Sequence, residues 1–257
     1  MDHAAETTAS RWSMAAAQLG ALALMLLSWE YVSSHRLVDP LFFGQPSGIL
    51  KYLQKALTDG SLLREAAWTL GSTLGAFALG SIAGIGTGLL FAIYPRAEVF
   101  FDPFFSALNA LPRIALAPLF LLWFGLGVAS KVALGFSLTF FIVLFSTLAG
   151  ARSVDRDFLI LSQTLGASKA TVFIKVTLQS AVPTIFSGLK LGLIYALLGV
   201  IAGEIIASQH GLGQLLTYFA GTFDTNAVFG VLTVLAVIGI VLTRAMTAIE
   251  DRLLRWR

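Results

Sequence analysis

The chain has 257 residues, of which 57% are hydrophobic and 12% are charged, with 17 Lys and Arg against 14 Asp and Glu. Soluble domains carry about 25% charged residues, so this composition cannot cover a water-soluble globule and indicates a single membrane domain over residues 1–257. Because the sequence contains no cysteine, disulfides, thiolate metal sites and cysteine nucleophiles are excluded. It has no basic stripe with interleaved aromatic residues, so we expect no nucleic-acid partner.

Six segments are apolar over about 20 residues, the length that crosses about 30 Å of hydrocarbon. They cover approximately residues 14–33, 68–94, 104–124, 132–149, 185–207 and 228–249. No small-residue cleavage pattern follows the first segment, so we interpret it as an uncleaved span rather than a signal peptide. The sequence therefore predicts an all-α, polytopic membrane protein with six transmembrane helices and both termini on one side.

The basic residues indicate which side faces the cytoplasm. If the N- and C-termini are cytoplasmic, eleven of the 17 Lys and Arg lie in cytoplasmic segments or span ends: Arg11, Arg96, Arg152, Arg156, Lys169, Lys175, Lys190, Arg244, Arg252, Arg255 and Arg257. Five lie on the opposite side: Arg36, Lys51, Lys55, Arg64 and Lys131. Cytoplasmic loops carry the excess of Lys and Arg, so this orientation is the one that we predict.

The segment Pro46–Asp59 follows the first span and has helical periodicity, with an apolar face opposite a polar one. The apolar face would hold Ile49, Leu50, Leu53, Ala56 and Leu57. Ser47 is the expected N-cap, and the helix would lie at the outer interface. Glu30, near the outer end of the first span, can reach the same interface.

The second span is rich in glycine: Gly71, Gly75, Gly80, Gly84, Gly86 and Gly88. Several of these form small-xxx-small pairs, which let helix backbones approach closely. One interpretation is close packing within the chain. The alternative is that this helix slides against others as the protein changes state.

Polar residues within spans are costly, so each is a functional candidate. Arg113 follows Pro112 and lies about 14 Å into the third span, and Glu204 lies about 21 Å beyond Lys190 in the fifth. Pro112 and Pro118 should bend the third helix. Two interpretations stay open: the two charges stabilise the bundle, as a pair or through separate backbone hydrogen bonds, or one or both line a translocation path for a small anion.

Enzyme motifs are missing from the sequence. It contains no GxxxxGK[ST] phosphate loop, no HExxH and no GxSxG, and its three histidines are scattered. We therefore expect neither an enzyme nor a chain that itself binds a metal or cofactor.

Residues 151–182 have the periodicity of a helix, a turn at Gly166 and a second helix, and Leu161 and Val172 are expected to pack the hairpin against itself. Residues 159–183, LILSQTLGASKATVFIKVTLQSAVP, resemble the cytoplasmic "EAA" loop of permease subunits of binding-protein-dependent ABC importers. Gly166 matches the glycine of that pattern, although residues 160–162 replace Glu-Ala-Ala and Gln179 replaces a usual proline. The segments 110–127 and 203–213 resemble the nitrate/sulfonate/taurine-type branch, and the similarity extends from about Pro46 to the C-terminus.

This resemblance implies a permease of the type I ABC importer fold in a bacterial inner membrane. Its partners would be a second permease subunit, expected to be a second copy, two ATPase subunits that hold ATP and Mg²⁺, a periplasmic substrate-binding protein, and membrane lipid. The hairpin would dock in the ATPase through Leu161, Thr164, Leu165, Gly166, Ala167, Ser168 and Lys169. Lys169 and Lys175 either meet acidic partner or lipid groups or are solvated.

The implied substrate is a small, anionic solute such as a sulfonate, taurine, nitrate or an aromatic acid, while related branches carry pyrimidine precursors or riboflavin. Two alternatives stay open. A secondary transporter driven by an ion gradient would show internal repeats and midplane acidic sites, and an intramembrane enzyme would need a nucleophile–base or metal constellation.

Overall fold

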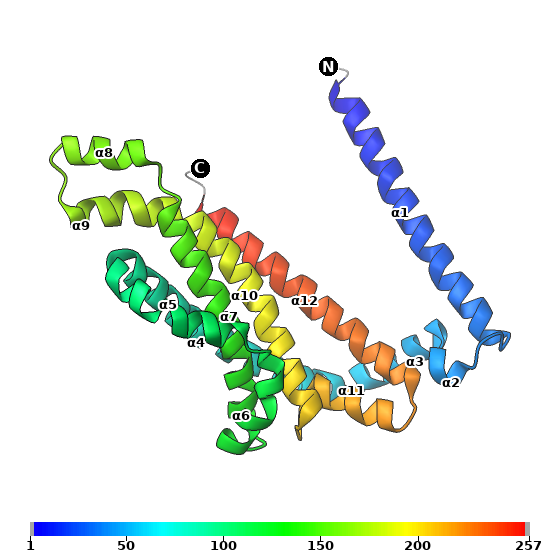
Figure 1. Ribbon diagram of the computed structural model, residues 1–257. Coiled ribbons are helices and arrows are strands. Elements are labelled where there is room, and N and C mark those ends of the chain that lie inside the picture. The colour runs from blue at the N-terminus through cyan, green and yellow to red at the C-terminus, as the bar shows by residue number, and fades with distance from the viewer. Residues whose placement is uncertain (1–2, 255–257) are drawn as a thin grey trace. The chain divides into compact units, whose positions relative to one another are not determined.

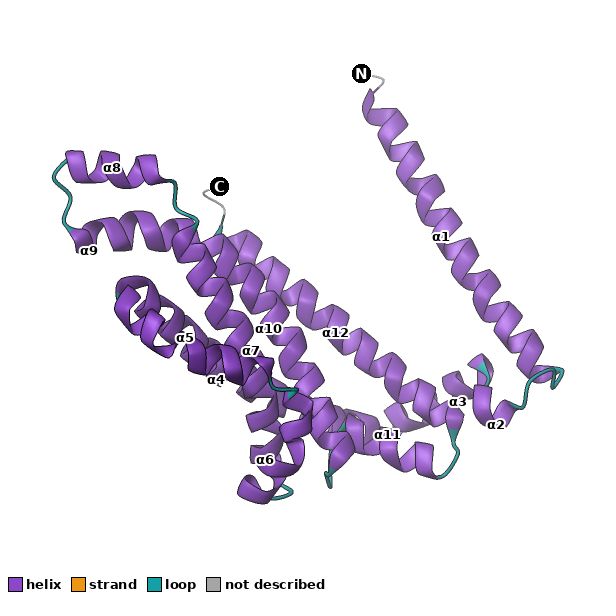
Figure 2. Cartoon of the chain, in the orientation of Figure 1, coloured by secondary structure: helices purple, strands orange, loops and turns teal. Residues whose placement is uncertain are grey.

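The computed structural model describes residues 3–254, which form helices joined by short loops and contain no strand (Figure 2). The all-α fold class is therefore confirmed for this part of the chain. Arg255 and Arg257, two of the residues used to predict the orientation, lie outside the described residues, as do the side chains of Arg11 and Arg156.

The chain divides into two compact units. Unit 1 comprises Met1–Leu62 and Leu216–Thr233, and unit 2 comprises Leu63–Leu215 and Val234–Arg257. The chain begins with the helices α1 (His3–Ser34), α2 (Pro40–Phe43) and α3 (Pro46–Thr58). They are followed by α4 (Ser61–Ile93), α5 (Pro95–Ala110), η1 (Arg113–Leu116), α6 (Ala117–Phe124) and α7 (Val128–Arg152). The last are α8 (Arg156–Thr164), α9 (Lys169–Val172), the π-helical turn η2 (Phe173–Thr177), α10 (Leu178–Ile206), α11 (Leu212–Gly221) and α12 (Thr225–Leu253).

Four long helices and one bent pair of helices correspond to the second to sixth predicted spans. Among the described residues, α4, α7, the continuous helix Lys169–Ile206 and α12 are long and apolar enough to cross a membrane. The helix pair Pro95–Ala110 and Arg113–Phe124 makes a fifth unit if it is counted as one span, bent by 85°. The first predicted segment lies within α1, and its role as a span stays a prediction.

The bend in the third predicted span occurs at Pro112. Leu111, the residue before it, is extended with ψ 136°, as expected for a residue whose helical conformation clashes with a following proline. Pro118 was expected to bend the helix too, but it lies in the first turn of α6, where a proline removes no helical hydrogen bond. The helix also begins earlier than predicted, at Pro95.

The start of α3 differs from the prediction. The helix begins at Pro46, a position that suits proline's fixed φ, so Gln45 is the N-cap and Ser47 lies inside the first turn. Ser47 instead donates from its backbone N–H and its hydroxyl to the carboxylate of Glu30, over 2.9 and 2.8 Å. The buried face is also narrower than expected, because Leu50 is 67% exposed.

In unit 2, α4 and α10 both pack closely against α7 through glycine. A Cβ on Gly84 would lie 2.8 Å from the backbone oxygen of Phe140, and one on Gly199 would lie 2.8 Å from the Cα of Gly135. A Cβ on Gly80 or Gly88 would likewise lie too close to Thr139 or Thr147, respectively. A Cβ on Gly71 or Gly86 would have no atom within 4 Å. These contacts favour the packing interpretation of the glycine-rich helix.

Candidate functional site

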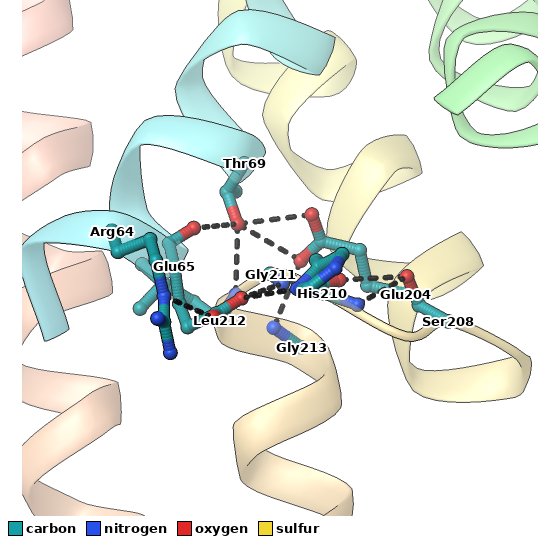
Figure 3. Close-up of polar contacts among 9 residues, drawn as sticks. All are labelled: Arg64, Glu65, Thr69, Glu204, Ser208, His210, Gly211, Leu212 and Gly213. Carbon is teal, nitrogen blue, oxygen red and sulfur yellow. Dashed lines mark hydrogen bonds and ion pairs between the residues drawn. The ribbon is translucent and has the colours of Figure 1, made fainter. Parts of the chain in front are cut away.

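Glu204, near the end of α10, is the centre of a buried polar cluster in unit 2 (Figure 3). Its side chain is 3% exposed. The Thr69 hydroxyl donates to both carboxylate oxygens, over 2.9 and 3.0 Å, and the backbone N–H of Gly213 donates to Oε2 over 2.9 Å. Burial of this carboxylate is therefore offset by hydrogen bonds from α4 and from the start of α11.

A second carboxylate, Glu65, accepts a hydrogen bond from the residue that precedes α11. Its Oε2 accepts the backbone N–H of Gly211 over 2.7 Å, and Thr69 Oγ1 accepts that of Leu212 over 2.8 Å (Figure 3). The first N–H groups of a helix lack partners within the helix, and its N-terminus favours negative charge. Glu65, Thr69 and Glu204 thus form a three-residue cap on α11, which we call the α11 cap.

Two glycines make this cap possible. Gly211 has φ +107°, in the region that side chains disfavour. A Cβ on Gly213 would lie 2.7 Å from both the Cβ of Glu204 and the backbone oxygen of Ile201. The carboxylate can approach the start of α11 only because both positions lack a side chain.

A pocket of about 220 Å³ lies beside the α11 cap. It is lined by Trp68, Ser72, Leu126, Gly127, Val128, Lys131, Glu204, Ser208, Gln209 and His210. Lys131 is 3% exposed, and its ammonium donates to the backbone oxygen of Leu126. The rings of Trp68 and His210 are stacked, with centroids 5.0 Å apart. The pocket therefore combines an aromatic wall with one buried group of each charge.

Arg113 lies elsewhere, at the break between α5 and α6. Its guanidinium donates to the side-chain oxygen of Asn109 and stands 4.3 Å from the ring centroid of Phe141. These residues do not join Arg113 to Glu204: no ion pair within 4.0 Å links the two among residues 3–254. The proposed Arg113–Glu204 pair is therefore wrong, because the α11 cap occupies Glu204.

The Arg113 guanidinium borders a pocket of its own, of about 310 Å³, together with Asn109, Pro112 and Leu138. Within the described chain its Nε is buried without a hydrogen-bond partner. A buried donor without an acceptor is costly, which makes this position a candidate for contact with a solute.

The segment between α7 and α10 is a helical hairpin, drawn as an arm of α8 and α9 in Figure 1. The turn passes through Gly166, whose φ is +76°. Ser168 accepts the backbone N–H of Thr171 over 3.2 Å and so caps α9. The sequence thus builds a defined turn between two helices.

The hairpin tip exposes apolar side chains. Leu165 is 77% exposed, and Phe158, Ile160 and Leu161 are each more than half exposed. The expectation that Leu161 packs the hairpin against itself is wrong, whereas Val172 is buried. Leu161 lies on the outer face of α8, so its side chain is available to a partner.

Sequence reasoning identified Glu204 but missed Glu65, Thr69 and Lys131 as its neighbours. Glu65 and Thr69 are four residues apart, a spacing that places both on one helix face, and this was the available signal. Lys131 gave none, because only the packing of α7 against α10 places its side chain beside Glu204.

Comparison with known proteins agrees with the resemblance to permease subunits of binding-protein-dependent importers. The family described as "Binding-protein-dependent transport system inner membrane component" matches residues 61–255. The taurine transport system permease protein TauC of Escherichia coli is 31% identical over 243 residues, covering 93% of this chain and 88% of that protein. The riboflavin transport system permease protein RibX of Chloroflexus aurantiacus is 32% identical over 235 residues, covering 91% and 88%.

Solved structures support the same fold. The chain matches the MetNI methionine ABC transporter in an inward-facing form with a TM-score of 0.65 and 18% identity, over 73% of this chain and 94% of that one. An amino acid ABC transporter matches with a TM-score of 0.63 and 17% identity, over 80% and 98%. The expected type I importer permease fold is therefore confirmed.

Proposed function

Since the chain belongs to the family of binding-protein-dependent transport system inner membrane components, we propose that it forms the translocation path of an ATP-driven importer. Members of this family are permease subunits of ABC importers and not enzymes, and the chain is a multi-pass inner-membrane protein. The proposal adds three points to this membership: the ATPase that drives transport, the other partner subunits and the transported solute.

The exposed apolar tip of the hairpin is the observation that carries the proposal. Leu161 and Leu165 are more than half exposed in the isolated chain, and contiguous exposed apolar side chains mark surfaces that a partner covers. We assign the tip, Leu161 and Thr164 to Lys169, to a groove of an ATPase subunit that binds ATP and Mg²⁺. The Lys169 and Lys175 ammonium groups would meet acidic groups around that groove.

The helix that leaves the hairpin is suited to transmit its movement. It runs without interruption over Lys169–Ile206, about 57 Å at 1.5 Å per residue. Its far end carries Glu204 and the adjacent pocket. In the proposed mechanism, ATP binding draws two ATPases together and the hairpins move with them as levers. The path then opens outward, and hydrolysis resets it inward.

We propose that two copies of this chain enclose the path, with both termini in the cytoplasm. A periplasmic binding protein would deliver a small, charged solute, in the class of sulfonates that the relative named for taurine suggests. Arg113 and Glu204 would contact this solute, since each borders a pocket. Arg113 supplies the positive charge that an acidic solute requires.

Affinity purification from native membranes tests whether the chain binds an ATPase subunit. A tagged wild-type chain should bring down an ABC-type ATPase, whereas a gradient-driven carrier would not. Leu165→Asp places a charge on the apolar tip and should reduce ATPase recovery about tenfold, because burying an unpaired charge in the groove is unfavourable. Leu50→Asp, at a leucine on α3 that is also largely exposed, is the matched control and should recover ATPase normally. Equal recovery in all three would contradict the assigned docking role.

A further inference from the structure

The pocket beside the α11 cap holds two opposite charges that do not touch. Lys131 and Glu204 both line it, and each is 3% exposed. Among the described residues no ion pair within 4.0 Å joins them. Buried charges are stabilised only when they are paired and hydrogen-bonded, so the pocket that both groups line favours a ligand that can reach both.

Each group keeps unused hydrogen-bonding capacity. An ammonium has three N–H donors, and the described contact of the Lys131 ammonium is the backbone oxygen of Leu126. A carboxylate has about four acceptor positions, whereas Glu204 receives one hydroxyl proton from Thr69 and one N–H from Gly213. Lys131 can therefore donate to an acid group, and Glu204 can accept from an amine.

The size and the wall of the pocket limit the ligand. Its volume of about 220 Å³ is sufficient for a short-chain solute. The face of the Trp68 indole offers an apolar surface for that chain, held in place by the stacked ring of His210.

We propose that this pocket binds a short zwitterion, a molecule with an acid group and an ammonium separated by a few methylene groups. The acid group would receive hydrogen bonds from Lys131 Nζ, the ammonium would donate to the Glu204 carboxylate, and the methylenes would lie on Trp68. A simple anion would gain Lys131 but meet the negative charge of Glu204. This inference rests on the proposed function and specifies the solute among small acids.

Competition binding tests the charge pattern. The tagged full-length chain, copurified with its membrane partners and placed in lipid nanodiscs, is incubated with radiolabelled 2-aminoethanesulfonate. Ethanesulfonate, which lacks the amine, and ethylamine, which lacks the acid, are the competitors. We expect each to compete about 10- to 100-fold more weakly than the unlabelled zwitterion, the factor that losing one charge-assisted hydrogen bond produces. Equal competition by ethanesulfonate would overturn the zwitterion assignment.

Substitution tests the place of binding. Lys131→Met keeps the aliphatic stem that packs near Gly203 and should weaken binding by the same factor, with an unchanged melting temperature. Lys51→Met removes an exposed positive charge from α3 and should bind like wild type. Wild-type affinity in Lys131→Met would overturn the site. If that variant does not fold, the competition series on the wild type still decides the proposal.

Failure of this inference can be told apart from failure of the proposed function. If 2-aminoethanesulfonate does not bind the wild type at millimolar concentration, the zwitterion site is wrong. Recovery of the ATPase with the same preparation would leave the importer function standing. Absence of the ATPase would remove that function, whatever the binding result.

Discussion

The two ends of the continuous helix Lys169–Ile206 differ in which side chains they bury and which they expose. At its start, the hairpin tip leaves Leu165 and Leu161 exposed. At its end, Glu204 is buried, and the hydroxyl and N–H groups that it meets come from α4 and α11 of the same chain. One end presents apolar surface without a cover, and the other presents buried charge with its partners in place.

This difference assigns separate roles to the two ends. A buried polar group must find its partners within the chain, because leaving it without them costs free energy of folding. An exposed apolar surface can be covered later by another subunit. Loss of the Glu204 carboxylate should therefore affect stability as well as solute binding, whereas changes at the hairpin should affect assembly and coupling.

Glu204→Leu should have the largest effect. It leaves the Gly213 N–H and the Thr69 hydroxyl buried without their acceptor, so we expect a loss of about 3 kcal/mol in unfolding free energy. Glu204→Gln retains one acceptor oxygen and should lose about half as much. Denaturant unfolding of the purified protein in detergent measures both. A loss below about 1 kcal/mol for Glu204→Leu would show that the α11 cap is not a main source of stability.

Gly166→Pro should act at the other end. Proline requires φ near −65°, whereas Gly166 has φ +76° and donates its N–H to Gln163 over 3.0 Å. The tip should change shape, and ATP-dependent uptake in proteoliposomes should fall about tenfold, equivalent to about 1.4 kcal/mol. Membrane insertion and the melting temperature should stay unchanged. Normal coupled uptake would contradict the docking role of this turn.

Arg113→Gln extends the comparison to a charge outside this helix, at the break that follows Pro112. Loss of the guanidinium removes the charge that we propose contacts the solute, so uptake should fall about fivefold, equivalent to about 1 kcal/mol. Arg113→Lys keeps the charge and should recover part of this loss. If Arg113→Gln left uptake intact and lowered only the melting temperature, its role would be stabilisation of the bundle.

Glu30→Gln should have the smallest effect and compares the same chemistry in a half-buried setting. Glu30 also accepts a backbone N–H at a helix start, from Ser47, but water can replace it there. Caps and dipole contacts at exposed helix ends contribute about 0.5 to 1 kcal/mol, so unfolding should change by no more than that. A loss equal to that of Glu204→Leu would remove the distinction between the fully buried Glu204 and the half-buried Glu30.

Some features of this protein follow from the sequence alone because they depend on neighbouring residues. The second to sixth predicted spans, the break at Pro112 and the hairpin turn at Gly166 result from local hydrophobicity and local steric limits. The periodicity and the motif order also sufficed to identify the family.

Other features were decided only by the tertiary structure. Glu204 meets Thr69 across 135 positions of sequence, and Lys131 lies beside it because glycines let α7 and α10 approach closely. Arg113, the partner suggested by depth along two helices, is occupied by Asn109 instead. Depth along a helix follows from residue count, but the direction in which a side chain faces its neighbours depends on how distant helices pack.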